Sequence, residues 1–197
     1  MFKKLKIKFV LINMGLLTAV FIGIFGTIYL STAYSIEKEM RMQLWSNINL
    51  SKMLSDTLLV FEVVIFEKGL ILEEDIVNDI FINGEKDQIK KLISILMDNA
   101  IKYTNDNGKI LVSLKAERNK AKLIIKNTGE GIKKEHLEKI FERFYRVDDS
   151  RDRGTGGYGL GLSIAKAIVD DHKGKIHAES IINNETSFIV ELPLIIG

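Results

Sequence analysis

The chain has 197 residues, of which 46% are hydrophobic, so it is long enough for one domain of ordinary size and a further segment. Its net charge of +2 produces no global field that would attract nucleic acid, and we expect no nucleic-acid partner. The absence of cysteine from the sequence excludes a disulfide framework and a thiolate metal site.

The N-terminus combines a basic flank with a long apolar segment. Four lysines lie within residues 1–8, and the next charged residue is Glu37. A helix over 9–34 would cross a hydrocarbon core about 30 Å thick, with Tyr29 and Tyr34 at an interfacial aromatic belt. A buried core helix and a cleavable signal peptide are the alternatives, but the apolar region of a signal peptide is shorter, about 7–15 residues. We therefore predict one transmembrane helix, a cell-membrane location and contact with membrane lipid.

Residues 35–56 are polar, and we interpret them as a juxtamembrane linker that could hold one helix. The following "TLLVFEVVIFEKG" continues as a helix and ends at Gly69, a residue typical of a helix C-cap. Two short strands are predicted from "LILEEDI" and "DIFING". The next segment, "EKDQIKKLISILMDNAIKYT", predicts an amphipathic helix, with apolar residues at helical spacing at Ile89, Leu92, Ile93 and Leu96.

The remainder of the chain alternates less regularly between strands and helices. A hairpin is predicted from "KILVSLKA" and "AKLIIKN" around "ERNK", and the Glu/Lys pattern of "KKEHLEKIFERF" predicts a helix. A further amphipathic helix follows a glycine-rich stretch and ends at "HKG", with Gly174 as its C-cap. The strands "KIHAES" and "SFIVELP" close the chain. We predict an α+β fold, with helices on one face of a mixed, mostly antiparallel sheet.

Three polar or glycine-rich segments are candidates for chemistry. Within "LMDNAIKYT", Asn99, Lys102 and Tyr103 share one helical face, where an amide oxygen could bind Mg²⁺, an ammonium a phosphate and a ring a base. In "NTGEGI" the chain turns sharply after a strand, so the Asn127 amide faces what lies beyond the strand end. The alternatives are a solvated helical face with a chance asparagine and an ordinary strand-to-helix turn.

The third segment, "GGYGLGL", opens a helix. The N–H groups and positive dipole end of a helix N-terminus form an anion site, and glycine lets the backbone approach a phosphate closely. The alternative is a flexible loop before an ordinary helix.

In chain order, "DNAIKYT", "NTGEGI", "FERFYR" and "GGYGLGL" resemble the N, G1, F and G2 boxes of sensor histidine kinases, which act in two-component signal transduction. The resemblance covers residues 57–197. It implies a two-layer α/β sandwich of the Bergerat type, shared with DNA gyrase, a heat-shock chaperone and mismatch-repair ATPases, and it implies ATP and Mg²⁺ as cofactors.

The resemblance also implies roles for individual residues. Asn99 would bind Mg²⁺, Lys102 and Tyr103 would line the nucleotide, and Asn127 would face the adenine amino group. The glycines of the G1 box and the residue after them would shape the adenine pocket: Gly129, Gly131 and Ile132. The F box would anchor the start of a lid, at Phe141, Phe144 and Tyr145. The end of the lid would wrap the phosphates, at Gly157, Tyr158, Gly159, Leu160, Gly161 and Leu162.

Two positions depart from the related families. The G1 box usually begins with aspartate, and the neutral Asn127 should weaken the bond to adenine by about 1 kcal/mol, or several-fold in affinity. Gyrase-type ATPases carry a water-activating glutamate four residues before the Mg²⁺-binding asparagine, where this chain has Ile95. An alkyl group cannot take a proton, so efficient ATP hydrolysis is not expected.

The phosphoacceptor of histidine kinases stands in a His-Glu-x-x-Thr-Pro stretch on a dimeric helical hairpin, and none of the three histidines has this context: His136, His172 and His177. No catalytic residue is identified. We therefore expect phosphoryl transfer in trans, to the histidine-containing dimerisation domain of another kinase, and indirectly to a response regulator. A nonenzymatic module that binds nucleotide or competes for a partner, and a remnant of an internally deleted sensor kinase, are the alternatives.

The charges that flank the apolar segment and the function implied by the resemblance predict opposite membrane orientations. The lysines before it outweigh the mixed flank after it, which predicts a cytoplasmic N-terminus and an external ATP-binding domain. The function implied by the resemblance requires that domain in the cytoplasm. We expect a single-pass protein with a cytoplasmic ATP-binding domain, against the charge bias.

Overall fold

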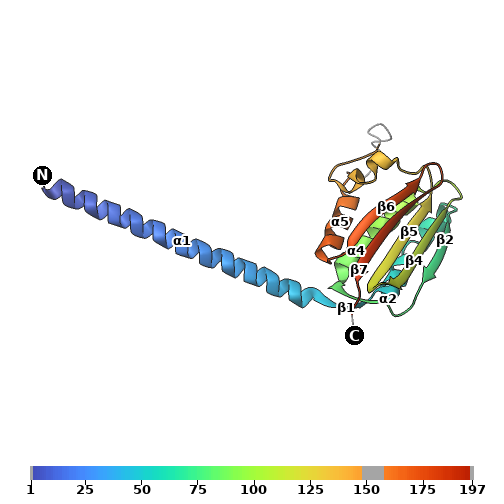
Figure 1. Ribbon diagram of the computed structural model, residues 1–197, viewed down its shortest axis with the longest axis horizontal. Coiled ribbons are helices and arrows are strands. Elements are labelled where there is room, and N and C mark those ends of the chain that lie inside the picture. Colours follow the sequence, from blue (N-terminus) through green and yellow to red (C-terminus); the bar gives the residue numbers. More distant parts are fainter. Residues whose placement is uncertain (1, 148–157, 196–197) are drawn as a thin grey trace. The chain divides into compact units, whose positions relative to one another are not determined.

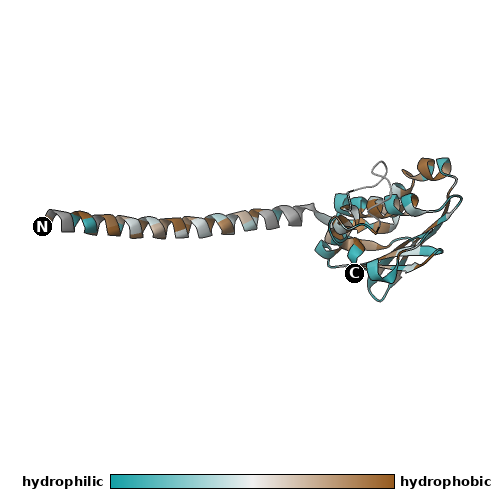
Figure 2. Cartoon of the chain, turned by 90° about the horizontal axis from the view of Figure 1, so that it is seen from above, coloured by the Kyte–Doolittle hydropathy of each residue, from teal (hydrophilic) through white to brown (hydrophobic). Residues whose placement is uncertain are grey.

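The computed structural model describes residues 2–147 and 158–195, and the chain divides into two compact units, Met1–Leu44 and Trp45–Gly197. The first unit is a single helix, α1 (Phe2–Leu44). Its stretch Lys6–Ile36 is long and apolar enough to cross a membrane, and its most apolar part has no buried residue among those that the structure describes. Figure 2 shows apolar residues along this helix, as expected for a candidate membrane span.

The second unit begins with a strand. β1 (Trp45–Asn49) pairs antiparallel with β3 (Phe81–Glu85), and α2 (Leu50–Leu58) follows β1 directly. The Asn49 side chain caps α2 by accepting a hydrogen bond from Lys52 N–H at 2.9 Å. Residues 35–56 are therefore not a linker with one helix, and the compact unit starts before residue 57. The strand was missed because it is short and buries only Ile48, so no alternating pattern develops.

A five-stranded sheet forms one layer of the second unit, in the order β2-β4-β5-β7-β6 (Figure 1). Its strands are β2 (Ile71–Ile76), β4 (Lys109–Glu117), β5 (Lys120–Thr128), β6 (Lys175–Ile181) and β7 (Glu185–Pro193). β2 pairs parallel to β4, and the other three pairings are antiparallel. The predicted hairpin is confirmed, since Arg118 and Asn119 both have positive φ between the paired Glu117 and Lys120, as a two-residue hairpin turn requires.

Helices form the second layer. α4 (Lys86–Tyr103) packs on β5, α5 (Gly161–Asp171) packs on β6, and the two helices contact each other (Figure 1). The four apolar residues predicted for the buried face of α4 have no exposed surface: Ile89, Leu92, Ile93 and Leu96. The helix predicted to continue to Gly69 is broken, because α2 ends at Leu58 and a separate short helix, α3 (Glu62–Glu67), follows after a turn. The positive φ of Gly69 agrees with the predicted helix end. The α+β class, with helices on a mostly antiparallel sheet, is confirmed.

The segment "KKEHLEKIFERF" does not form the predicted helix. It contains two 3-10 turns, η1 (Lys134–His136) and η2 (Lys139–Phe141). The neighbouring Ile140 and Phe141 are both buried, and the Phe141 ring lies edge-on to Phe188 with 6.4 Å between centroids. Tertiary packing of these two adjacent side chains outweighs a helical charge pattern, which stabilises a helix by only about 0.2–0.5 kcal/mol per pair.

The C-terminus of α5 also differs from the expectation. The left-handed conformation belongs to Lys173, with φ 55°, and not to Gly174. A Cβ on Gly174 would lie 2.5 Å from the carbonyl oxygen of Glu191. The glycine is therefore required by its close approach to β7.

Candidate functional site

Asn99 lies on the half of α4 that faces the start of α5. Its Nδ2 donates to the Ile95 carbonyl oxygen at 2.8 Å, so the amide oxygen points away from the helix backbone. A Cβ on Gly161 would lie 3.5 Å from the Ile95 side chain and 3.9 Å from Asn99 Nδ2. The predicted Mg²⁺ ligand, the residue that replaces the hydrolytic glutamate and the first residue of α5 are therefore neighbours.

The N-terminus of α5 has no side-chain cap. Its N-cap residue, Leu160, makes no side-chain hydrogen bond, and the first turn holds no acidic residue. Among the described residues, therefore, no side chain caps this end, and the first N–H groups of the helix with its positive dipole end could bind an anion. Asn99 and this helix end together offer a cation ligand and an anion site side by side.

Lys102 and Tyr103 lie at the C-terminal end of α4. The Lys102 Nζ is 5.1 Å from the centroid of the Tyr103 ring, and the Tyr103 side chain is exposed. An ammonium and a ring presented together in this way can meet the phosphate and the base or sugar of one ligand.

Asn127 occupies the end of β5, and only 3% of its surface is exposed. Its Nδ2 donates to the Thr128 carbonyl oxygen at 3.1 Å. Within the described residues, no buried side-chain nitrogen or oxygen lacks a hydrogen-bond partner. Among the described groups, none is bonded to the amide oxygen of Asn127, which leaves this oxygen able to accept from a ligand.

The glycines after Asn127 bring the turn against two other elements. A Cβ on Gly129 would collide with the Tyr103 carbonyl oxygen at the end of α4. Gly131 has φ +77°, and a Cβ there would lie 2.6 Å from the Ile181 carbonyl oxygen. Ile132 N–H donates to Ser180 Oγ on β6 at 2.8 Å. Both glycines are required here by close approach, and they place the end of β5 beside Tyr103.

Asn105 and Thr128 also join the end of α4 to the end of β5. Thr128 Oγ1 donates to Asn105 Oδ1 at 2.7 Å, and Asn105 N–H donates to the Thr128 carbonyl oxygen at 3.3 Å. These bonds hold the residues just after α4 to the end of β5. Sequence reasoning missed both residues, because each lies in a turn and their pairing depends on a contact across 23 positions.

The F and G2 segments meet at Phe144 and Gly159. Phe144 N–H donates to the Gly159 carbonyl oxygen at 3.0 Å, and both residues have positive φ, 64° and 69°. A Cβ on Gly159 would lie 2.9 Å from the Phe144 carbonyl carbon. Tyr145 is held by its hydroxyl, 2.6 Å from His136 Nδ1. The two ends of the predicted lid are thus tied together, while Gly157 lies outside the described residues.

Other predicted lid residues differ in their surroundings. The Tyr158 side chain is exposed, as is Phe144, whereas Phe141 is buried in the core. Leu162 is partly buried against the core. Phe141 and Leu162 therefore hold the two ends of the predicted lid to the domain. The exposed rings of Phe144 and Tyr158 are available to contact another molecule.

The donor set around Asn99 suits a magnesium ion that is shared with phosphate oxygens. In the described part of the chain, no group of three or more His, Cys, Asp or Glu side chains could hold a metal by itself. Mg²⁺ usually keeps several waters and takes one or two protein ligands beside substrate phosphates. The neighbouring Asp98 is partly desolvated, which raises the pKa of its carboxyl.

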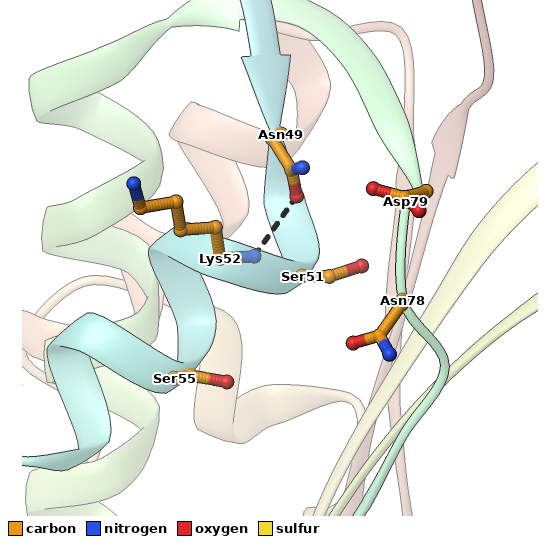
Figure 3. Close-up of a pocket in the computed structure, with 6 residues that line it drawn as sticks. All are labelled: Asn49, Ser51, Lys52, Ser55, Asn78 and Asp79. Carbon is orange, nitrogen blue, oxygen red and sulfur yellow. Dashed lines mark hydrogen bonds between the residues drawn. The ribbon is translucent and has the colours of Figure 1, made fainter.

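A separate polar hollow of about 340 Å³ lies at the N-terminal end of α2 (Figure 3). Six residues line it: Asn49, Ser51, Lys52, Ser55, Asn78 and Asp79. Ser51 Oγ donates to the Val77 carbonyl oxygen at 2.7 Å and accepts from Ile80 N–H at 3.1 Å. Because Ser51 and Asn49 are already bonded within the protein, and no predicted site residue lines the hollow, we assign it no ligand.

Residues 84–196 match the family described as histidine kinase-, DNA gyrase B- and HSP90-like ATPases. The chain belongs to this family. It is 42% identical over 134 residues to the sensor protein DltS of Streptococcus agalactiae, across 68% of this chain and 34% of DltS. It is 34% identical over 160 residues to the sensor histidine kinase RppB of Synechocystis, across 81% of this chain and 35% of RppB. The chain thus spans about a third of the length of these relatives.

Solved structures agree with this family. The catalytic domain of histidine kinase ThkA is 30% identical, with a TM-score of 0.66 over 76% of this chain and 95% of that one. ThkA in complex with the response regulator protein TrrA is 30% identical, with a TM-score of 0.63 over 85% of this chain and 48% of that one. The resemblance to histidine kinase ATP-binding domains and the predicted fold are both confirmed.

Proposed function

We propose that the unit Trp45–Gly197 binds Mg·ATP and positions its γ-phosphate for transfer to a histidine in two-component signalling. The observation that carries this proposal is the pairing of Asn99 with the uncapped N-terminus of α5. A triphosphate with a bound divalent cation needs both an oxygen ligand and a set of N–H donors at one place. Membership of the ATPase family supports the same ligand.

The other site residues are assigned by their positions around this pair. Asn99 would hold Mg²⁺ through Oδ1, and the ion would neutralise charge on the phosphates. Lys102 would meet a phosphate, and Tyr103 would stack on the base or sugar. The amide oxygen of Asn127 would accept from the adenine amino group, in a pocket shaped by Gly129, Gly131 and Ile132. Phe144 and Tyr145 would anchor the start of the lid. The end of the lid would wrap the phosphates: Gly157, Tyr158, Gly159, Leu160, Gly161 and Leu162.

Ile95 favours storage of ATP over its hydrolysis. Its side chain lies beside Asn99 and Gly161, where a water-activating group would have to stand. An alkyl chain accepts no proton, so the bound γ-phosphate keeps its bond until an acceptor arrives. Positioning and electrostatics supply most of the catalysis in phosphoryl transfer.

The acceptor is proposed to lie on another chain. His172 is buried with both ring nitrogens bonded, His136 is bonded to Tyr145, and His177 lies on the exposed side of β6. None of them stands on a helical hairpin. The partner would be the histidine-containing dimerisation domain of another kinase, with a response regulator downstream, as the ThkA–TrrA complex shows for a relative. A membrane anchor over 9–34 after a basic flank, and lipid contact, complete the proposal.

A second candidate is a nonenzymatic module that binds nucleotide and competes for a kinase's partner. Ile95 favours it, because bound ATP would persist without chemistry. The two candidates share the nucleotide site and differ only in whether phosphate leaves it.

The nucleotide site is tested by calorimetric titration of the full chain in detergent with ATP, with and without Mg²⁺. Asn99→Ala should remove most of the Mg²⁺-dependent gain in affinity, whereas Asn107→Ala, in an exposed turn, should not. An absence of binding at millimolar ATP would overturn the proposal. Phosphate transfer is then tested with γ-labelled ATP and a partner kinase whose own ATP site is inactivated, where labelled histidine favours the kinase and its absence favours the nonenzymatic module.

A further inference from the structure

A buried histidine joins α4 and α5 at the end opposite to Asn99. His172 is the C-cap residue of α5, and 3% of its surface is exposed. Its Nδ1 is 2.7 Å from the Ile168 carbonyl oxygen, and its Nε2 is 3.0 Å from the backbone nitrogen of Glu85. A carbonyl only accepts and an amide N–H only donates, so Nδ1 carries the proton and Nε2 is the acceptor. Because Glu85 is the N-cap of α4, His172 ties the two helix ends together.

The His172 ring fits closely between two further residues. A Cβ on Gly84 would lie 2.7 Å from the ring, so only glycine lets β3 approach it. On Trp45 the indole stacks on the imidazole, with 4.8 Å between centroids and 14° between planes. Trp45 is the first residue of the compact unit and follows Leu44, the last residue of α1. The first residue of the compact unit, Trp45, therefore contacts His172 directly.

The two helices run antiparallel, and their other ends meet at the candidate nucleotide site. Gly161 begins α5 beside Asn99, and the eleven residues of α5 span about 16 Å. Close-packed helices transmit a shift at one end to the other, because their interface leaves no room to absorb it. A shift at the His172 contact would therefore reach the place where Asn99 and the N-terminus of α5 lie side by side.

We propose that Trp45 and His172 form a latch that positions the α4–α5 pair and couples the entry of the chain at residue 45 to nucleotide affinity. The proposal rests on nucleotide binding at Asn99 and the start of α5. Both latch residues are positioning residues, since neither reaches the site. Coupling of this kind is reciprocal, so bound nucleotide must also change the latch.

Trp45 is the single tryptophan of the chain, so its emission reports on the latch in the native protein. We expect Mg·ATP to change the Trp45 emission of the full chain in detergent, with the same concentration dependence as the calorimetric binding. Asn99→Ala should abolish this change at the same ATP concentrations. Calorimetric binding without any change in Trp45 emission would overturn the latch while leaving nucleotide binding intact.

Two substitutions at His172 separate its hydrogen bond with Glu85 N–H from its stacking on Trp45. His172→Phe keeps a ring for Trp45 and loses the acceptor for Glu85 N–H, whereas His172→Gln keeps an acceptor at that position and loses the stack. We expect His172→Phe to weaken Mg·ATP binding about fivefold or more, and His172→Gln to recover part of this loss. The matched control is His177→Phe, at an exposed position on β6, which should bind as the wild type does.

A structural role alone would lower the melting temperature without changing the affinity of the folded protein. Affinities are therefore measured well below the melting temperature of each variant. If folded His172→Phe and Trp45→Ala both bind Mg·ATP within twofold of the wild type, the latch is overturned. If the wild type itself binds no nucleotide by calorimetry, the proposed function fails, and the coupling fails with it.

Discussion

The two ends of the α4–α5 pair satisfy their polar groups in opposite ways. At the His172 end, both ring nitrogens and the N-cap N–H of α4 are bonded within the protein. At the Asn99 end, no described side chain caps α5, and only the nitrogen of the Asn99 amide is bonded to the helix backbone. We therefore expect substitutions at the His172 end to act mainly on stability, and substitutions at the Asn99 end to act mainly on the proposed nucleotide binding.

The largest effect on stability is expected at the His172 end of the α4–α5 pair. His172→Ala removes the stack on Trp45 and leaves Glu85 N–H without its acceptor, so the free energy of unfolding should fall by about 2–4 kcal/mol. Chemical denaturation followed by circular dichroism measures this change. A loss below about 0.5 kcal/mol would show that the His172 end does not stabilise the domain more than the Asn99 end.

Gly159→Ala should have the next largest effect. The left-handed φ of Gly159 costs a residue with a Cβ about 1–2 kcal/mol, and the new Cβ meets the backbone of Phe144. We expect lower stability and weaker nucleotide binding, measured by denaturation and calorimetry. Gly161→Ala is the control for stability, because its Cβ would make only ordinary contacts at 3.5 Å and 3.9 Å.

Asn99→Ala should hardly change stability. Its amide oxygen points away from the helix backbone, and Ala is the better helix former, so the free energy of unfolding should change by less than about 0.5 kcal/mol. The variant should nevertheless lose Mg²⁺-dependent binding. A destabilisation as large as that of His172→Ala would remove the contrast between the two ends.

The smallest effect is expected from Asp98, beside Asn99. Desolvation raises the pKa of its carboxyl above the ordinary value of 3.8, so the folded state disfavours the charged form. This cost is absent below the ordinary pKa of 3.8, grows as the pH rises from there to the raised pKa, and is complete above it. Asp98→Asn should therefore melt slightly higher than the wild type at pH 7, and the difference should vanish at low pH. Melting curves at both pH values test the sign.

Short-range sequence patterns were sufficient to predict the helix and the hairpin that carry the candidate site. The spacing of Ile89, Leu92 and Leu96 predicted α4, and "ERNK" predicted the β4–β5 turn, because each depends on residues close together in the chain. The four segments "DNAIKYT", "NTGEGI", "FERFYR" and "GGYGLGL", in this order, led to the family. The helix predicted for residues 133–144 did not form, because the burial of Ile140 and Phe141 depends on the core and not on their neighbours in sequence.

The sequence by itself determined a long apolar helix, an α+β domain of the histidine kinase ATPase type and the residues of the proposed nucleotide site. Only the tertiary structure decided that β1 belongs to the domain, that Lys173 and not Gly174 takes the left-handed conformation, and that His172 joins α4 to α5. The physical reason is distance along the chain. Glu85 and His172 are 87 positions apart, and no local pattern records a hydrogen bond that only the packed sheet and helices bring together.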